Sequence, residues 1–376
     1  MTDFTSKIHN SIHEIDRSVW NNLNGDSIFT SFEYLSALED TKCVGVETGW
    51  QIAHLSISEN GEIIGLVPLY LKYHSQGEYV FDQGWAKAYE DAGGRYYPKL
   101  LSASPFTPVV GGRLLAHNLN VKAALLTALR QICQTNNISS AHINFANSQD
   151  IELIKNNGFM VRQDLQYWWL NDGFNSFDDF LATTTASRRK TMKRERREVA
   201  DKVQFQTIQG NDITESHLDT LYTFIADTYE RKWGRGIPYL TRAFFSRIKE
   251  TMADTMVLIF GKINDEYVSG AINFYSGDTL YGRQWGCNID LPFLHFETCY
   301  YQAIDFAIRN NIRKVEAGTQ GEHKISRGYR PHKTYSGHYI VNESFRHAVG
   351  DFLAHETREI DAIIPELNDK LPFKKG

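Results

Sequence analysis

The sequence predicts a mixed α/β protein built from two similar halves, and three observations support this prediction. Helix-like and strand-like stretches alternate along the chain, and each half contains a β-hairpin, marked by Asn60-Gly61 in the first and Asn264-Asp265 in the second. The same order of helices, hairpin, further strand, helix and strand occurs twice. A chain of 376 residues also exceeds the size at which a single hydrophobic core stops growing.

We therefore predict an N-terminal domain at 1–172, a connector at 173–210 and a C-terminal domain at 211–376, with a ligand site in the cleft between the domains. In the first domain the expected elements are helices within 12–40, a hairpin at 54–75, strands and loops over 77–115, a helix at 120–137, a strand at 139–146, a helix at 148–159 and a strand at 160–170. In the second they are helices at 216–233 and 239–252, a hairpin at 255–277, strands at 279–287, 314–318 and 333–341, and a final helix at 344–364.

Composition narrows the class of protein. The net charge of −5 argues against a protein that coats DNA through its overall field. The cysteines are Cys43, Cys133, Cys287 and Cys299, and their scattered positions indicate no metal site and no disulfide framework. The first twenty residues have no apolar signal-peptide core, and the apolar run at 63–71 is too short to cross a membrane. We expect a cytoplasmic protein without a transmembrane segment; the sequence leaves its oligomeric state open.

The stretch at 281–331 carries the clearest functional signal. A strand is followed by a loop and by a helix that we expect Asp290 to cap, with Pro292 in its first turn. A short strand then ends at Gly318, and the loop beyond it concentrates ionisable side chains. Because loops at the carboxyl ends of strands bind ligands in open α/β sheets, we interpret this loop as one wall of a binding site. A solvated turn with ordinary surface charges is the alternative.

The connector contains a strongly basic helix. Between 188 and 197 it has seven Lys or Arg residues against Glu195, so seven minus one leaves a local charge of about +6. A phosphate-bearing substrate, an anionic membrane surface and plain solvent are the three partners that this pattern allows. A helix that inserts into a membrane is disfavoured because Met192 and Val199 are nearly its only apolar residues.

Four runs of sequence resemble the FemAB-like proteins of peptidoglycan biosynthesis or recognition, a branch of the GNAT acyltransferase superfamily. They are GEYVFDQGWAKAYE, YYPKLLSASPFTPVVGGRLL, LHFETCYYQAIDFAI and EAGTQGEHKISRGYRP. The resemblance extends over about residues 15–373 and implies tandem GNAT-like domains. It also implies an N-acyltransferase that moves an acyl group from a thioester such as acyl-CoA to an amine. A Fem-type enzyme, which takes an aminoacyl group from tRNA and places it on a peptidoglycan precursor, is an alternative.

Acyl transfer to an amine needs a base for the amine proton and donors for the oxyanion. Candidates for the base are Glu297, His295, Glu316 and His323, although Glu297 also suits the first turns of a helix for electrostatic reasons alone. The resemblance places Lys324 at the lysine that faces the transferred carbonyl in Fem ligases. There an aromatic residue precedes this lysine, whereas His323 precedes it here.

Candidate donor-binding residues come from a short superfamily signature and from the basic segments. The pyrophosphate pattern Gln/Arg-x-x-Gly-x-Gly/Ala is approached by RQWGCN, in which Asn288 replaces the small last residue. A glycine bulge in an aromatic strand explains the same letters. The predicted donor-binding residues are Arg283, Gly286, Arg189, Lys193, Arg196 and Arg327.

The aromatic first half predicts a groove for the acceptor amine, although core packing explains many of the same aromatic residues. The predicted substrate-binding residues are Tyr79, Asp82, Trp85, Arg95, Tyr97 and Lys99. Acyl-CoA is the expected co-substrate, the acceptor is a small-molecule or peptide amine, and aminoacyl-tRNA is the alternative donor. A non-catalytic protein that binds a muropeptide or another anionic ligand is the alternative from a different class.

Overall fold

The computed structural model describes residues 4–234, 236–318 and 321–374. The chain forms two compact units, which we describe separately. Unit 1 contains the residues up to Leu165 together with Lys333–Ala362, and unit 2 contains Gln166–His332 together with the residues from Ile363 onward. Both units therefore include a segment from the C-terminal part of the chain, which the sequence did not suggest. The domain boundaries at 172 and 210 stay a prediction.

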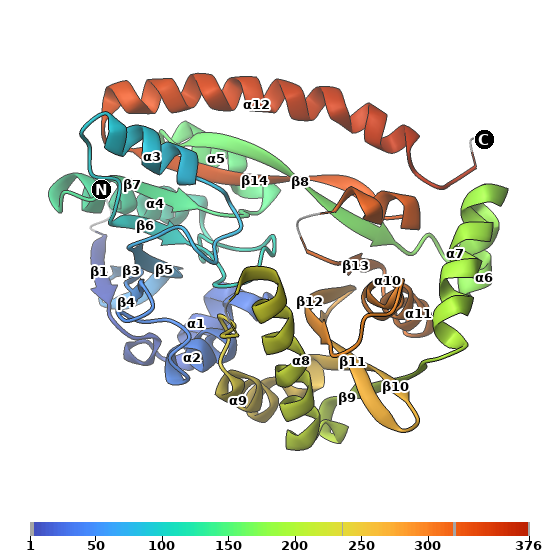
Figure 1. Cartoon of the computed structure of the whole chain (residues 1–376). Helices are drawn as coiled ribbons and strands as arrows, with labels where there is room; N and C mark the ends of the chain where they lie inside the picture. The colour runs from blue at the N-terminus through green and yellow to red at the C-terminus, as the bar shows by residue number, and fades with distance from the viewer. Residues whose placement is uncertain (1–3, 235, 319–320, 375–376) are drawn as a thin grey trace. The chain divides into compact units, whose positions relative to one another are not determined.

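Unit 1 contains two groups of paired strands (Figure 1). The first is antiparallel and joins β1 (Thr5–His9), β3 (His54–Glu59) and β4 (Glu62–Val67). The second runs in the order β2 (Trp50–Ile52), β5 (Leu69–Lys72), β6 (Lys99–Ser102), β7 (Ser140–Ile143) and β14 (Arg330–Ile340). In this second group β6 and β7 are parallel, and the other pairs are antiparallel.

Helices cover these strands in unit 1. The amphipathic α4 (Leu119–Thr135) connects β6 to β7 and packs on β3, β4, β6 and β7 (Figure 1). Its buried side chains include Leu125 and Leu129, which lie in one apolar cluster with Leu69 and Ile143. The remaining helices of this unit are α1 (Arg17–Asn24), α2 (Phe32–Asp40), α3 (Gln83–Asp91), α5 (Ile151–Asn156) and the first part of α12 (Glu343–Asp369).

Unit 2 is built on a mixed sheet. Its strands follow the order β8 (Met160–Leu170), β13 (Lys314–Glu316), β12 (Thr279–Cys287), β11 (Glu266–Ser276), β10 (Met256–Ile263) and β9 (Gln204–Gln209). The pair β12–β13 is parallel, and the neighbouring pairs are antiparallel. Its helices are α6 (Phe177–Thr183), α7 (Ala186–Ala200), α8 (Glu215–Trp233), α9 (Arg242–Met252), α10 (Leu294–Phe296) and α11 (Gln302–Arg309).

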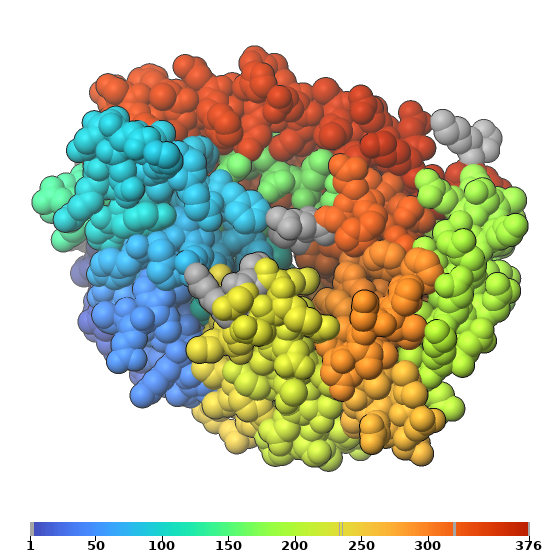
Figure 2. Space-filling model, viewed as in Figure 1, coloured from blue at the N-terminus to red at the C-terminus, as the bar shows by residue number. Residues whose placement is uncertain are grey.

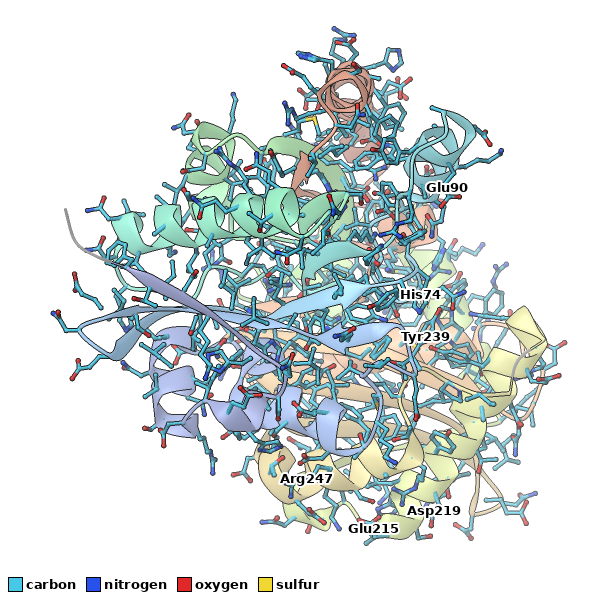
Figure 3. The ribbon with its side chains drawn as sticks, turned by 90° about the vertical axis from the view of Figure 1, so that its left-hand side faces the viewer. His74, Glu90, Glu215, Asp219, Tyr239 and Arg247 are labelled. Carbon is cyan, nitrogen blue, oxygen red and sulfur yellow. The ribbon has the colours of Figure 1, made fainter. Side chains whose placement is uncertain are left out.

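Ion pairs join the two helices that precede β10. The Arg242 guanidinium at the start of α9 lies 2.7 Å from Asp219 and 2.8 Å from Glu215, both on α8. Figure 3 labels both residues, Glu215 and Asp219. Because they are more than half exposed, solvent screening limits what each pair contributes to stability.

The repeated element order is confirmed. Each unit has helices before a hairpin and then a strand–helix–strand crossover whose strands are parallel, β6–α4–β7 in unit 1 and β12–α10–α11–β13 in unit 2. Both hairpin turns form as predicted, with positive φ at Asn60 and Gly61 and at Asn264 and Asp265. None of the described helices is both long and apolar enough to cross a membrane.

Two sequence predictions about local structure are wrong. Residues 83–91 form α3 rather than a strand or loop, because Trp85, Ala86 and Tyr89 recur at helical spacing and pack against other apolar residues. The helix expected to start at Asp290 begins at Leu294 instead, and Pro292 lies outside it. Phe293 has a φ of 66°, a left-handed conformation that cannot continue a right-handed helix.

Gly286 lies where β12 and α8 approach most closely. A Cβ added at this residue would lie 2.0 Å from the Phe224 carbonyl oxygen of α8, a distance that real Cβ atoms do not reach. The two overlapping atoms would be the Cβ of the new residue and a backbone oxygen, so no side-chain rotation relieves the overlap. The glycine thus has a packing function, whatever its relation to the donor.

We expect Gly286→Ala to lower the free energy of unfolding by about 3 kcal/mol or more, because β12 and α8 must move apart. Gly84→Ala is the matched control: its added methyl meets nothing within 4 Å, and alanine favours the helix α3. Urea unfolding of both variants measures the difference. Equal stability of the Gly286→Ala variant and the natural chain would contradict the close approach.

Candidate functional site

A small pocket opens between the sheet of unit 2 and the helix that follows β12. Its volume is about 80 Å³, and its walls include Arg283, Trp285, His295, Tyr300 and Ala317. The strands β11 and β12 shift register here: Ile272 pairs with Gln284 and Asn273 with Gly282, so that Arg283 is the extra residue of a bulge. Bulges of this kind redirect side chains next to functional sites. The volume suits a small group such as an acyl carbonyl.

The helix beside this pocket changes its winding. Between α10 and α11 the residues Glu297–Tyr301 form a π-helical turn. Such turns insert an extra residue into an α-helix and occur frequently at functional sites. Here the turn includes Cys299 and Tyr300, both of which line the pocket. Burial raises the pKa of the Tyr300 hydroxyl, so it retains its proton at neutral pH.

The loop after Gly318 contributes two ionisable groups next to the pocket. Residues Glu322–Arg327 form a short 3₁₀-helix, whereas Thr319 and Gln320 of the predicted loop lie outside the described residues. His323 Nε2 lies 2.9 Å from the Tyr300 hydroxyl oxygen. Burial, with the nearby cations Lys324 and Arg327, lowers the pKa of His323. A neutral imidazole therefore faces a protonated tyrosine that lines the pocket.

Lys324 is buried beneath the same loop. Its ammonium donates to the carbonyl oxygens of Ala317 at 2.7 Å and Gly318 at 2.9 Å, so it fixes the turn that forms one wall of the pocket. Burial lowers the pKa of Lys324 from 10.5 to about 7. A strongly perturbed lysine next to a pocket is typical of a functional site.

The loop and the basic helix α7 meet, but through an acidic residue. Arg327 donates to both carboxylate oxygens of Glu195 at 2.8 and 2.9 Å, and the Tyr301 hydroxyl donates to the same carboxylate at 2.5 Å. The next residue of α7, Arg196, binds Glu297 at 3.0 Å and Asp305 at 2.6 Å. These contacts hold α7 against the π-helical turn.

The predicted catalytic residues have different surroundings. His295 and His323 lie within the aromatic cluster at the pocket, with ring centroids 6.2 Å apart, and burial lowers the pKa of His295 to about 3. Glu316 is buried at the end of β13 with its carboxylate 3.6 Å from Arg283, and burial raises its pKa. Glu297 is engaged by Arg196 and by Gln302, which donates at 2.7 Å. It is not among the described residues that line the pocket.

The predicted donor-binding residues also separate into groups. Arg283 lines the pocket, and Gly286 packs on α8. Arg196 and Arg327 are committed to carboxylates. Lys193 is exposed on α7 and lies 3.1 Å from the exposed Asp178. Arg189, on the same helix, is partly buried. The surface of α7 is visible in the yellow-green region of Figure 2.

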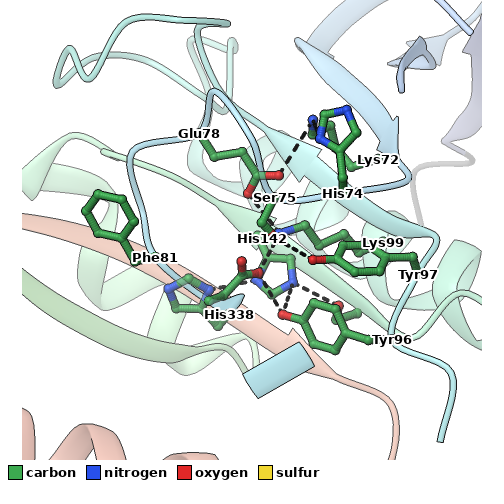
Figure 4. Close-up of polar contacts among 12 residues, drawn as sticks. Lys72, His74, Ser75, Glu78, Phe81, Tyr96, Tyr97, Lys99, His142 and His338 are labelled. Carbon is green, nitrogen blue, oxygen red and sulfur yellow. Dashed lines mark hydrogen bonds and ion pairs between the residues drawn. The ribbon is translucent and has the colours of Figure 1, made fainter. Parts of the chain in front are cut away.

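A second cluster of ionisable groups is buried in unit 1 (Figure 4). The ammonium of Lys99, which is fully buried, donates to Glu78 at 2.8 Å, to Ser75 at 2.9 Å and to Asp82. Burial opposes ionisation of Asp82, but Lys99, together with His142 and the hydrogen bond from Ser75, holds the pKa of this carboxyl well below its usual range. Burial lowers the pKa of Lys72 to about 7 and raises that of Glu78 to about 7.

This cluster contains three of the six predicted substrate-binding residues, Asp82, Tyr97 and Lys99: the Tyr97 hydroxyl lies 2.8 Å from Ser75 Oγ, which Lys99 contacts. Trp85 packs edge-on against His338, whose Nδ1 lies 2.7 Å from Nδ1 of His142. The remaining two predicted residues are Tyr79 and Arg95. Tyr79 is partly buried and has a φ of 60°, and Arg95 is exposed.

Several residues of these clusters were not predicted. Trp285 and Tyr300 lie in apolar and aromatic stretches and gave no signal beyond core packing. The π-helical turn that contains Tyr300 has no sequence signature. Glu195 is the single acidic residue among seven Lys or Arg residues. This isolation could have indicated that Glu195 is buried and binds a cation, as it does with Arg327. Among the described residues, no group of three or more His, Cys, Asp or Glu side chains is arranged to hold a metal ion.

The strand order and the repeated units define a mixed α/β protein whose fold is similar to that of FemX. A model of the FemAB-like family, described as peptidoglycan biosynthesis/recognition, matches residues 11–375, so the chain belongs to this family. Together, family and fold support a Fem-type or acyl-type transferase. No curated protein matches the sequence.

Solved structures with a similar fold have little sequence in common with this chain. The crystal structure of FemX is 12% identical, with a TM-score of 0.54, over 92% of this chain and 100% of FemX. L-PGS from Bacillus licheniformis is 10% identical, with a TM-score of 0.50, over 85% of this chain and 95% of that chain. A tandem GNAT protein from the clavulanic acid biosynthesis pathway is 8% identical, with a TM-score of 0.49, over 90% and 99% of the two chains.

Proposed function

We propose that the protein transfers an acyl group from acyl-CoA to an amine, and that the pocket beside Tyr300 holds the reacting carbonyl. The observation that carries this proposal is the contact of 2.9 Å between the neutral His323 ring and the Tyr300 hydroxyl at the pocket wall. A base, a proton carrier and a buried lysine thus lie around a space suited to a small polar group. Arg283 also lines the pocket, with the Glu316 carboxylate 3.6 Å away.

The chemistry assigned to these groups is a direct transfer. The amine nitrogen attacks the thioester carbonyl, and Tyr300 accepts the amine proton while its own proton passes to His323 Nε2. Lys324 stabilises the oxyanion, whose collapse breaks the C–S bond. The thiolate of CoA takes the proton back from His323, so that an amide and free thiol leave the site.

Glu297 and the unit 1 cluster have supporting functions in this proposal. Because Arg196 and Gln302 already engage its carboxylate, Glu297 fixes α7 rather than accepting a proton. Glu316 balances Arg283 in the same way. The ammonium of Lys99 is surrounded by Glu78, Asp82 and Ser75, so in this proposal it neutralises buried acids inside unit 1 and does not bind the acceptor.

Release of CoA thiol from acetyl-CoA and from longer acyl-CoAs up to decanoyl-CoA, with a panel of primary amines, tests the function. We expect Tyr300→Phe and His323→Ala each to lower kcat by about 100-fold, because both interrupt the proton path. Tyr275→Phe, the same change at an exposed tyrosine of β11, is the control and retains turnover. Unchanged kcat in Tyr300→Phe would remove the proton path. Absence of thiol release with every amine, together with binding of a muropeptide, would favour a recognition protein.

One observation favours aminoacyl-tRNA as the alternative donor. The exposed residues of α7 include Arg188, Lys190, Lys193, Arg194 and Arg197. Such a surface suits a phosphate backbone, and binding to it weakens steeply as salt rises. A Fem-type reaction on a peptidoglycan precursor therefore predicts that charged tRNA binds with a steep salt slope, which Lys193→Gln and Arg194→Gln flatten. Binding that does not depend on these cations would dismiss this donor.

A further inference from the structure

A larger pocket adjoins the candidate active site in unit 2. Its volume is about 330 Å³, and it lies between the end of α8, the end of β12 and the loop that leads into α10. The two pockets share Trp285 and His295, whose rings stack with centroids 4.5 Å apart and an interplanar angle of 28°. A substrate whose carbonyl occupies the smaller pocket would therefore reach the larger one by passing this ring pair.

The larger pocket is lined mainly by apolar side chains. Ile289, Leu291, Phe293 and Phe296 contribute to its walls and are each partly exposed, whereas Leu294 is fully buried behind them. Partly exposed apolar side chains that face one concave space are typical of ligand pockets, and a volume near 330 Å³ lies in the range of small-molecule sites. Burial of an apolar ligand would remove this surface from water.

Polar groups stand at the rim of this pocket. Lys232, Arg231 and Asp290 are exposed and remain hydrated when an apolar chain enters. Arg231 donates to the Cys287 carbonyl oxygen, which ties the end of α8 to the end of β12. The pocket thus combines apolar walls with charged side chains that are exposed to solvent.

The loop that forms one wall is held in a defined shape. Cys287 Sγ donates to the Ile289 carbonyl oxygen at 3.3 Å, and the Leu294 amide donates to the Leu291 carbonyl oxygen at 3.2 Å. Phe293 has a φ of 66°, a conformation that costs free energy for a bulky residue and persists where the surroundings enforce it. The strained residue turns the chain so that its neighbours face the pocket.

We propose that the larger pocket binds the apolar chain of the acyl group, and that this protein transfers medium-length acyl groups rather than acetyl or aminoacyl groups. The inference rests on the proposed transfer at the neighbouring pocket and names the substrate class of that site. Leu291 and Ile289 limit the chain length, and the stacked Trp285 and His295 rings guide the chain between the two pockets.

Chain-length series test this proposal with two separate readouts. With one amine and a series from acetyl-CoA to decanoyl-CoA, kcat/KM should rise about fourfold per added methylene until the pocket is full. Calorimetry with the neutral n-alkanols from butanol to decanol should show the same dependence of Kd on length, without requiring turnover. Leu291→Trp fills the pocket and should remove the length dependence in both series. Ile237→Trp, at an 81% exposed residue, is the matched control and should retain it.

The two readouts separate failure of this inference from failure of the proposed function. Transfer from acetyl-CoA as efficient as from octanoyl-CoA, or alkanol binding that Leu291→Trp leaves unchanged, would overturn the pocket assignment. Length-dependent alkanol binding without thiol release from any acyl-CoA would keep the pocket as an apolar ligand site and reject the acyl transfer.

Discussion

Replacing Lys324 by methionine should lower kcat by about 100-fold to 1000-fold while leaving the protein folded. The ammonium has three donors, and two of them are used by the Ala317 and Gly318 carbonyls. In the proposed mechanism the third donates to the oxyanion, and loss of one such donor costs about this factor in rate. Methionine has a similar length and fills the buried space without a charge.

The same substitution should change how stability depends on pH, which separates its effect on catalysis from general damage to the fold. Since burial lowers the pKa of Lys324 from 10.5 to about 7, the unfolded chain binds the proton more tightly than the folded chain does. The destabilisation is complete below pH 7 and disappears as the pH rises towards 10.5. We expect the Tm of Lys324→Met relative to the natural chain to be greater at pH 6 than at pH 9, because only the natural chain gains stability over this range.

The kcat of the natural chain should fall as the pH rises, whereas its stability should increase. Neutral Lys324 has two N–H donors, both used by the backbone carbonyls, so its third donor exists only in the protonated state. We expect kcat to fall as the pH rises through about 7, and this fall to be absent in Lys324→Met. Lys262→Met, at a partly exposed lysine over the Tyr267 ring, is the control. Full turnover in Lys324→Met would reject the oxyanion assignment.

The parts of the fold that follow from local physics were predictable. The Asn60-Gly61 and Asn264-Asp265 turns require positive φ, which these residue types adopt at low cost, and both hairpins form where expected. The helix α4 was predictable from its apolar spacing. The start of the helix at Leu294 was not, because Asp290 and Pro292 are typical of a helix start, whereas the left-handed conformation of Phe293 has no sequence signal.

The sequence pointed to residues that lie near one another in unit 2, but it did not reveal their partners, and their functions stay a prediction. The loop after Gly318 was identified by its density of ionisable groups, and Lys324 and His323 do lie next to a pocket. That Arg196 would bind Glu297, and Arg327 would bind Glu195, depends on tertiary contacts more than a hundred residues apart in the chain. Charge counts along a sequence cannot distinguish a cation that binds a ligand from one that neutralises a buried acid.

Replacing Lys99 by methionine should lower the free energy of unfolding of unit 1 by about 3 to 5 kcal/mol. The side chain is fully buried, and its removal leaves Glu78 and Asp82 as buried carboxylates that have lost their closest cation. Lys72 lies 3.8 Å from Glu78 and compensates for only part of this loss. Urea unfolding at pH 7, followed by hydrogen exchange of the β6 amides, measures the change.

The charge at Asp82 accounts for most of this loss of stability. The difference in free energy of unfolding between Lys99→Met and the natural chain should therefore depend on pH. In the natural chain Lys99 holds the pKa of Asp82 low, which stabilises the folded state above the unfolded pKa near 4 and is lost as the pH falls below it. The two proteins should therefore approach each other in stability at acidic pH, and Asp82→Asn should restore part of the stability of Lys99→Met at pH 7. Lys87→Met, in an exposed pair with Asp91, is the matched control, with an expected change below about 1 kcal/mol. A Lys99→Met variant as stable as Lys87→Met would mean that the buried carboxylates are protonated in the folded chain, and that the cluster carries no charge for Lys99 to balance.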